Sequence, residues 1–272
     1  MPRGTSSSSF ASAGDGANLY YERTGAGAPV LLVMGLGMNA TGWWRTIPVL
    51  AQRLEVIAFD NRGSGRSDVT DGPYTMEQLA DDAVAVLDAC GIDRSHVYGI
   101  SLGGMIAQQV ALRHPERVDR LVLGATTPGG PRHVKAADDV LRLVGARGTL
   151  TAEQAAWASV PINYSRRTRE QHGQRIAEDV SRRLEYPITG RGYGAQLPAA
   201  MGFRLGDGAG AVAAPTLVMH GDEDVLVPPE NGRILAELIP GATLRMLPEA
   251  AHIYPTDEPA ADREVLEFLG RE

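Results

Sequence analysis

The feature that most constrains the fold is a regular alternation of short apolar runs with helical patterns. The runs are rich in Val, Ile and Leu, end in turn residues, and occupy 29–35, 54–60, 96–101, 120–126, 214–224 and 242–250. Apolar residues at helical spacing fall at 75–91, 102–118, 229–241 and 257–269. Apolar strands separated by helices predict an α/β fold with a mostly parallel sheet and helices on both faces. Residues 17–25 are expected to form an antiparallel starting strand.

Residues 128–205 interrupt this alternation with helical, arginine-rich segments that hold 12 basic and 7 acidic residues. An insertion between two strands of such a sheet lies above their carboxyl ends, where open α/β folds bind ligands. We therefore expect a helical cap, or lid, over 128–205 and a core built from 17–127 and 206–272. The arginines of this insertion include Arg166, Arg167, Arg169, Arg182 and Arg183. We interpret them as a solvated face, because charge runs on helices usually face water.

Composition excludes several classes of partner. The chain has 272 residues and a formal net charge of −7, which argues against nucleic acid, whose binding needs a basic surface. The single cysteine, Cys90, excludes an intramolecular disulfide and a cysteine-based zinc site. Residues 1–16 lack the apolar segment of a signal peptide and predict a disordered tail. No run reaches the roughly 18 to 20 apolar residues of a membrane helix, so we expect a soluble cytoplasmic protein; its oligomeric state is not indicated.

Ser101 stands between a predicted strand and a predicted helix, in the sequence Gly99-Ile100-Ser101-Leu102-Gly103. This sequence fits the G-x-S-x-G pattern, whose sharp turn needs small residues two positions before and after the serine. Such a turn exposes the hydroxyl above the sheet, beside the positive end of a helix. The alternative is a serine that only caps the helix, with glycines that serve packing. The context favours a nucleophile.

A serine nucleophile needs a base, and the base needs an orienting acid. For this kind of sheet the expected chain order is serine, acid, histidine. His252 follows the last predicted strand, and the loop after the preceding strand offers Asp222, Glu223 and Asp224. All of these positions fall at the same edge of the sheet as Ser101. We therefore expect a triad there. A calcium loop at 222–224 is disfavoured, because the later oxygen ligands are missing.

The chain resembles the α/β-hydrolase superfamily from about Ala17 to Leu269. The resemblance depends on VMGLG (33–37), DNRGSGRSD (60–68), GISLGG (99–104), HGDEDVLVP (220–228) and AH (251–252). It implies that Asp224 is the acid and that the backbone N–H groups of Leu36 and Leu102 form the oxyanion hole. It also implies a bracing role, through hydrogen bonds, for three charged residues of the second motif: Asp60, Arg62 and Arg66.

Residues 67–82, followed by GISLGGM, are similar to 3-oxoadipate enol-lactonases and related esterases. The expected function is hydrolysis of a carboxylic ester or small lactone through an acyl-enzyme, without a metal or organic cofactor. Three alternatives share the same residues: a carbon–carbon bond hydrolase, a perhydrolase, and a slow-turnover receptor of the same fold. Dehalogenases and epoxide hydrolases of this superfamily need a carboxylate where Ser101 stands, so the sequence does not favour them.

Overall fold

The computed structural model describes residues 6–271 and contains one eight-stranded sheet. The strands are β1 (Ser7–Ser12), β2 (Asn18–Gly25), β3 (Ala28–Val33), β4 (Leu54–Phe59), β5 (Ser95–Ile100), β6 (Val118–Gly124), β7 (Thr216–Gly221) and β8 (Thr243–Leu247). Their order across the sheet is β1-β2-β4-β3-β5-β6-β7-β8. The pairs β1–β2 and β2–β4 are antiparallel, and all other neighbours are parallel. The predicted mostly parallel sheet is confirmed.

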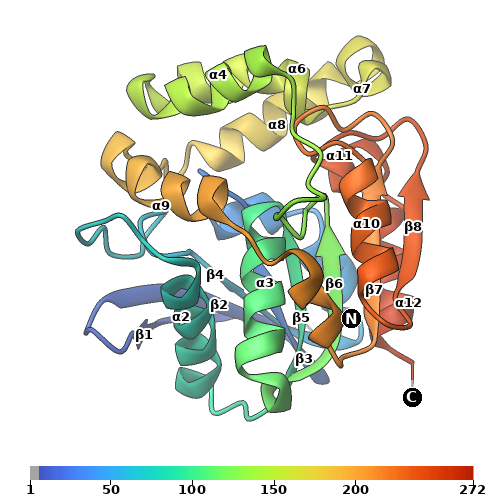
Figure 1. Cartoon of the computed structure of the whole chain (residues 1–272). Coiled ribbons are helices and arrows are strands. Elements are labelled where there is room, and N and C mark those ends of the chain that lie inside the picture. The colour runs from blue at the N-terminus through green and yellow to red at the C-terminus, as the bar shows by residue number, and fades with distance from the viewer. Residues whose placement is uncertain (1–5, 272) are drawn as a thin grey trace.

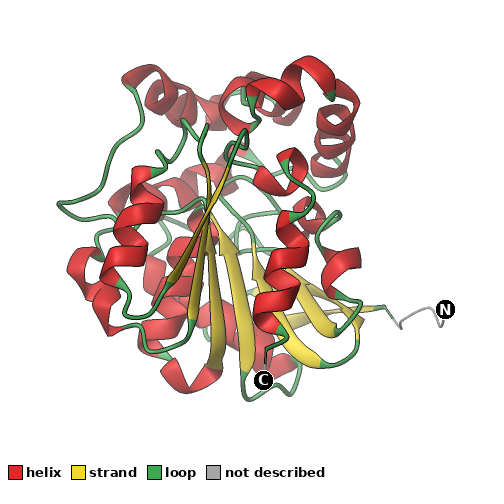
Figure 2. Cartoon of the chain, turned by 90° about the vertical axis from the view of Figure 1, so that its right-hand side faces the viewer, coloured by secondary structure: helices red, strands yellow, loops and turns green. Residues whose placement is uncertain are grey.

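Helices cover both faces of the sheet, as Figure 2 shows. One face carries α2 (Met76–Ala89), α3 (Leu102–Arg113) and α10 (Glu230–Leu238), and the other carries α1 (Ile47–Leu50) and α12 (Ala261–Leu269). Strand β3 explains this division, because successive side chains of a strand point to opposite faces. Leu31 and Val33 pack in the first apolar layer, whereas Val30 and Leu32 pack in the second. Burial on both faces accounts for the continuous apolar runs of the sequence.

Strand β1 corrects the prediction of a disordered tail over 1–16. Ser7–Ser12 pair antiparallel with β2, and residues 1–5 lie outside the described part of the chain. Only Ala11 of this edge strand is buried, so the strand lacks the apolar alternation that identifies one from sequence. The Phe10 ring meets the Tyr20 ring edge-on, with centroids 5.4 Å apart. The described core therefore begins at Ser7.

Two helix boundaries also differ from the prediction. The helix predicted within 102–118, with Pro115 as its expected stop, ends at Arg113, and a 3₁₀ turn, η2 (Pro115–Arg117), follows. The helix predicted over 257–269 begins later, at Ala261, as α12, and a separate short helix, α11 (Tyr254–Asp257), precedes it. The remaining 3₁₀ turns are η1 (Ala40–Trp43), η3 (Arg147–Thr149) and η4 (Gly206–Ala211).

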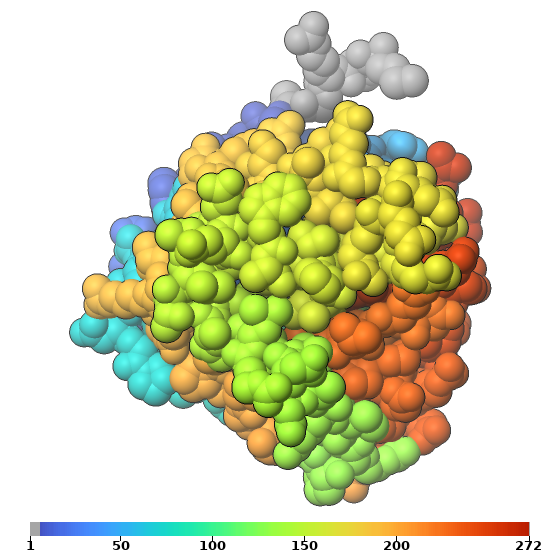
Figure 3. Space-filling view, turned by 90° about the horizontal axis from the view of Figure 1, so that it is seen from above, coloured from blue at the N-terminus to red at the C-terminus, as the bar shows by residue number. Residues whose placement is uncertain are grey.

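Six helices lie between β6 and β7 in the sequence. They are α4 (Asp138–Ala146), α5 (Ala152–Ala158), α6 (Val160–Asn163), α7 (Arg166–Gln171), α8 (Gly173–Arg183) and α9 (Gly190–Gly202). Figure 1 places them above the carboxyl end of β6, and Figure 3, seen from that side, shows light green to pale orange residues spread over this end of the molecule. An isolated antiparallel bridge joins Gly129 to Arg204 at the two ends of the insertion. None of the helices in the described range has the length and apolarity needed to cross a bilayer.

Candidate active site

Ser101 lies at the turn between β5 and α3 in a strained backbone conformation. Its φ is 60° and its ψ is −122°, a region that costs a residue with a side chain about 1–3 kcal/mol. The Ser101 N–H donates to the Gly124 carbonyl at 2.9 Å, and its own carbonyl accepts from Thr126 Oγ1 at 2.7 Å. These hydrogen bonds to the end of β6 and the loop after it hold the turn in place.

The glycines of this turn allow α3 to approach the sheet. A Cβ atom on Gly99 would lie 2.1 Å from the Gly103 carbonyl oxygen, and one on Gly103 would lie 1.9 Å from the Val33 carbonyl oxygen. Both positions therefore exclude any side chain. The alternative of a simple helix cap is not supported, because the Ser101 side chain makes no capping hydrogen bond.

The loops after β7 and β8 bring Asp224 and His252 into contact. His252 Nδ1 lies 2.8 Å from Asp224 Oδ2, and both residues are buried. Asp224 Oδ1 also accepts the backbone N–H groups of Leu226 and Val227, each at 2.9 Å. The other two acidic candidates lie elsewhere: Asp222 is exposed, and Glu223 accepts the Arg166 N–H at the start of α7.

The surroundings of Asp224 keep it ionised. Burial opposes ionisation, but the His252 and His220 rings outweigh this effect and lower the pKa of the Asp224 carboxyl to about 2. His220 Nε2 donates to the Val227 carbonyl at 2.8 Å and lies 3.3 Å from Asp224 Oδ2. A carboxylate on Asp224 must accept from His252, so the proton of a neutral imidazole stands on Nδ1 and Nε2 is left as an acceptor.

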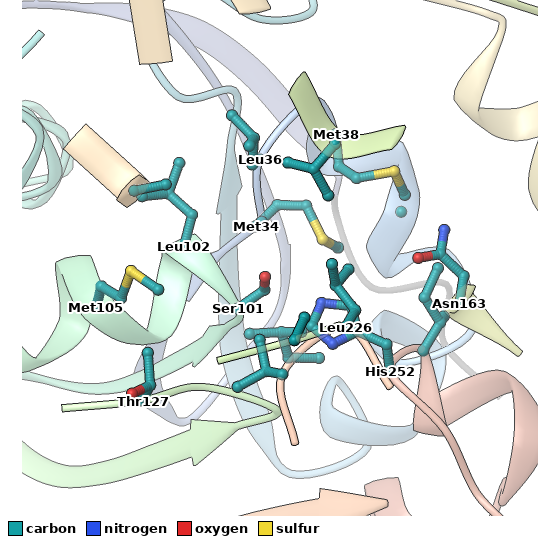
Figure 4. A pocket seen from close by; sticks show the side chains of 18 of the residues that line it. Met34, Leu36, Met38, Ser101, Leu102, Met105, Thr127, Asn163, Leu226 and His252 are labelled. Atoms are coloured by element: carbon teal, nitrogen blue, oxygen red, sulfur yellow. The ribbon is translucent and has the colours of Figure 1, made fainter. Parts of the chain in front are cut away.

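Ser101 and His252 line the same cavity. Figure 4 shows the Ser101 hydroxyl between the Leu102 side chain and the loop that carries His252. No hydrogen bond joins this hydroxyl to the His252 ring within the described structure. Such contacts are often absent before a substrate binds, and a serine hydroxyl reorients by rotation about one bond between staggered positions.

The loop after β3 lies against the serine. A Cβ atom on Gly35 would be 3.0 Å from Ser101 Cβ and 3.6 Å from its Oγ, so a side chain at this position would crowd the serine. Among residues 6–271, the backbone N–H groups of Leu36 and Leu102 have no hydrogen-bond acceptor. Two free donors beside a serine have the chemistry of an oxyanion hole.

The same loop is braced by the motif at 60–68. Asn61 Nδ2 donates to the Met34 carbonyl at 2.8 Å, and Asp60 Oδ1 accepts the Ala40 N–H at 2.7 Å. Arg66 in turn donates to Asp60 Oδ2 through its side chain at 2.9 Å. These bonds agree with the expected bracing role of the motif and hold the loop in place.

The cavity has a volume of about 290 Å³ and lies between the core and the inserted helices. Most of its lining is apolar: Met34, Leu36, Met38, Trp44, Leu102, Met105, Leu141, Val144, Phe203, Leu226 and Ile253. Asp179 of α8 also lines the cavity, and it accepts hydrogen bonds from Trp44 Nε1 at 3.0 Å and from Thr256 Oγ1 at 2.6 Å. The site therefore suits a small, largely apolar molecule.

One arginine corrects the interpretation of the insertion as a solvated face. Arg183 is only 8% exposed, and Arg147, which the sequence analysis does not single out, is 6% exposed. Arg147 also lines the cavity. Its position could not be recognised from the sequence, because helix periodicity assigns a face but not the partner that covers it. Within the described range, His, Cys, Asp and Glu residues form no cluster of three or more that could hold a metal ion.

Comparison with known proteins identifies the family. A model of the alpha/beta hydrolase fold matches residues 28–259, so the chain belongs to this family of hydrolases. It is 35% identical to a protein of Variovorax paradoxus (strain S110), provisionally named carbamate hydrolase RutD, over 93% of this chain and 96% of that protein.

Two solved structures show the same fold over nearly the whole chain. The enol-lactonase from Burkholderia xenovorans LB400 superposes with a TM-score of 0.86 at 26% identity, over 97% of this chain and 100% of that chain. A meta-cleavage product hydrolase from Pseudomonas fluorescens IP01 gives a TM-score of 0.81 at 25% identity, over 96% of each chain. The chain is therefore similar to hydrolases whose names refer to different substrates.

Proposed function

We propose that the protein is a serine hydrolase that cleaves a carboxylic ester or a small lactone. The observation that carries the proposal is that Ser101 and His252 line one cavity, while Asp224, from a third loop, contacts the His252 ring at 2.8 Å. The strained serine turn, the ionised acid and the free N–H groups each support one part of this chemistry.

In the first half-reaction, His252 Nε2 takes the proton of Ser101 as Oγ attacks the carbonyl carbon. The Leu36 and Leu102 N–H groups stabilise the negative oxygen of the tetrahedral intermediate, and one such donor is worth roughly 2.7–4 kcal/mol of barrier. The bond to the alkoxy oxygen then breaks, and the His252 proton goes to the departing alcohol. Asp224 holds the imidazole and stabilises its positive charge.

In the second half-reaction, water attacks the acyl-enzyme. His252 takes a proton from the water, and the new tetrahedral intermediate uses the same two N–H groups. The bond to Ser101 Oγ breaks, His252 returns the proton to the serine, and the acid is released. For a lactone, acid and alcohol remain parts of one molecule. No step requires a metal or an organic cofactor.

The inserted segment 128–205 serves, in this proposal, as a cap over a core of residues 7–127 and 206–271. Its helices contribute Leu141, Val144 and Asp179 to the cavity lining. A volume of about 290 Å³ lies just below the roughly 300–1,000 Å³ that is usual for ligand pockets. The cap thus limits the substrate to a small molecule.

Hydrolysis of p-nitrophenyl acetate and butyrate tests the proposal. We expect turnover by the wild type and a loss of at least about 10³-fold in kcat for Ser101→Ala and His252→Ala, because the triad acts as a unit. Unchanged thermal unfolding of the variants would show that the fold is intact. Wild-type protein that turns over neither ester but binds small esters tightly would instead be a receptor.

A carbon–carbon bond hydrolase is the second candidate, and the similarity to a meta-cleavage product hydrolase favours it. The same serine and histidine would then act on a ketone carbonyl. A panel of lactones and meta-cleavage products separates the two candidates, because the preferred class shows the higher kcat/KM. If meta-cleavage products were turned over at least about tenfold more efficiently than every ester and lactone, the ester assignment would be replaced.

A further inference from the structure

Arg147 and Arg183 are two buried guanidinium groups without a carboxylate partner. They are 6% and 8% exposed, and no acidic side chain of residues 6–271 lies within 4.0 Å of either one. Arg62 provides the contrast, because it is 1% exposed and pairs with Asp82 at 2.7 Å. Charges buried this deeply in proteins are normally paired. The two unpaired arginines therefore require an explanation.

Arg147 faces the active-site cavity beside the oxyanion loop. It lies in η3 and contributes to the lining of the 290 Å³ cavity. Its Nη2 is 3.3 Å from the position that a Cβ atom on Gly37 would take, one residue after Leu36. Its Nε has no hydrogen-bond partner in the described structure. The guanidinium therefore presents unused donors next to the proposed oxyanion hole.

Arg183 lies behind Arg147. The two side chains, together with Tyr193, line a second cavity of only about 20 Å³, which has room for about one water molecule. An organic anion must therefore reach Arg147 from the larger cavity. Burial, followed by the charge of Arg147, lowers the pKa of Arg183 to about 10. Guanidinium groups are not deprotonated in proteins at neutral pH, so both side chains are charged and their fields add.

The other basic residues at the larger cavity have partners or are exposed. Arg45 pairs with Glu178 at 2.8 Å, Arg204 donates to the Phe203 carbonyl at 2.7 Å, and Lys135 is exposed. Arg147 is thus the buried arginine of this lining whose guanidinium has neither a carboxylate nor a hydrogen-bond partner within the described part of the chain.

We propose that Arg147, supported by the charge of Arg183, binds a carboxylate of the substrate. This inference depends on the proposed function and narrows it to esters or lactones that carry a carboxylate a few atoms from the scissile carbonyl. A planar guanidinium forms paired hydrogen bonds with a carboxylate, and the apolar lining accommodates the carbon chain between the two groups. The bound anion neutralises the buried charge that the free protein leaves unpaired.

Two esters with the same leaving group test this assignment: p-nitrophenyl butyrate and the singly charged p-nitrophenyl hydrogen succinate. We expect the ratio of kcat/KM for the charged ester to that for the neutral ester to fall about tenfold to a hundredfold in Arg147→Met, the loss expected for a hydrogen bond to a charged group. Arg147→Lys should recover part of the ratio. The matched control is Arg142→Met, which removes an exposed arginine of neighbouring α4 and should leave the ratio unchanged. An unchanged ratio in Arg147→Met would overturn the proposal.

Calorimetry on Ser101→Ala measures the binding of esters directly, without turnover and without a change to either arginine. We expect monomethyl succinate to bind at least about tenfold more tightly than dimethyl succinate, and the difference to decrease at high salt. Equal binding of the two esters, or binding of neither, would refute the anion site. A wild-type protein that hydrolyses neither p-nitrophenyl ester would contradict the proposed function instead, and the calorimetry would still decide the carboxylate site.

Discussion

Asp224 uses its two oxygens differently, and this division predicts the effect of one substitution. Oδ1 accepts two backbone N–H groups, which an asparagine oxygen could still satisfy, whereas Oδ2 meets His252 Nδ1. In Asp224→Asn, the amide NH₂ would donate to Nδ1 and move the ring proton to Nε2, which could no longer accept from Ser101. We therefore expect kcat for p-nitrophenyl butyrate to fall by about 10⁴-fold.

The matched control for that substitution is Asp222→Asn, since Asp222 is the exposed acid of the same loop. It should retain activity close to that of the wild type. If Asp224→Asn kept more than about a tenth of the wild-type kcat with an unchanged melting temperature, another residue would have to orient His252.

At the residue level, the sequence was sufficient where local order determines position. Ser101, His252 and the acidic loop 222–224 each follow a strand, and the ends of parallel strands meet at one edge, so their approach could be expected before any coordinates. The choice of Asp224 within that loop came from the family resemblance. Arg147 is different, because its burial depends on Tyr193, a residue of another helix. The guanidinium carbon of Arg147 lies 5.3 Å from the centroid of the Tyr193 ring. No local pattern encodes such a contact.

Between secondary-structure elements, Asp262 links the first turn of α12 to the start of α1. It is 2% exposed, and its Oδ1 accepts from Thr46 Oγ1 at 3.1 Å. Burial raises the pKa of this carboxyl to about 7, against the opposing effect of the Thr46 hydrogen bond. In the unfolded chain the pKa of an aspartate is about 3.9.

These pKa values give Asp262 a destabilising effect that increases with pH. Below about pH 4 the group is protonated in both states and costs nothing. From there to about pH 7 the unfolded chain releases the proton and the folded protein keeps it, so the free energy of unfolding of the wild type falls. The loss is on the order of 1.4 kcal/mol per pH unit and amounts to a few kcal/mol at most. Asp262→Asn keeps an acceptor for Thr46 and should not show this loss.

Urea unfolding of the wild type and Asp262→Asn at several pH values measures the effect. The difference in the free energy of unfolding should grow in favour of the variant between pH 4 and 7 and stay constant above. Other titrating groups affect both proteins equally, so the difference isolates Asp262. Parallel stability curves over this range would show that Asp262 does not titrate as proposed.

The strand that the sequence analysis missed shows the limit of pattern recognition for whole elements. The parallel strands β3 to β7 are recognisable because most of their residues are buried on both faces and are therefore apolar. Strand β1 lies at the edge, where solvent covers most of its side chains, and its residues need only pair their backbone with β2. Serine residues satisfy that requirement, so the composition of this strand resembles that of a disordered tail.

For the whole molecule, Asp179 is the carboxylate of the proposed cap that contacts three side chains of the core. Asp179 of α8 accepts from three core side chains: Trp44 Nε1 at 3.0 Å, Arg45 Nε at 3.1 Å and Thr256 Oγ1 at 2.6 Å. Its side chain is 10% exposed. Since these residues surround the cavity, the position of α8 relative to the core determines the shape of the site.

We therefore expect Asp179→Ala to loosen α8 without loosening the sheet. Removing the carboxylate leaves three buried or half-buried donors without an acceptor, at about 1–3 kcal/mol each where water cannot replace it. Hydrogen exchange of the amides in Gly173–Arg183 should accelerate at least about tenfold, while strands β3 and β5 keep the wild-type rate. Glu178→Ala is the matched control, because the neighbouring carboxylate is 41% exposed and contacts the core through Arg45 alone. Equal exchange in the two variants would mean that apolar packing, rather than Asp179, holds α8 over the cavity.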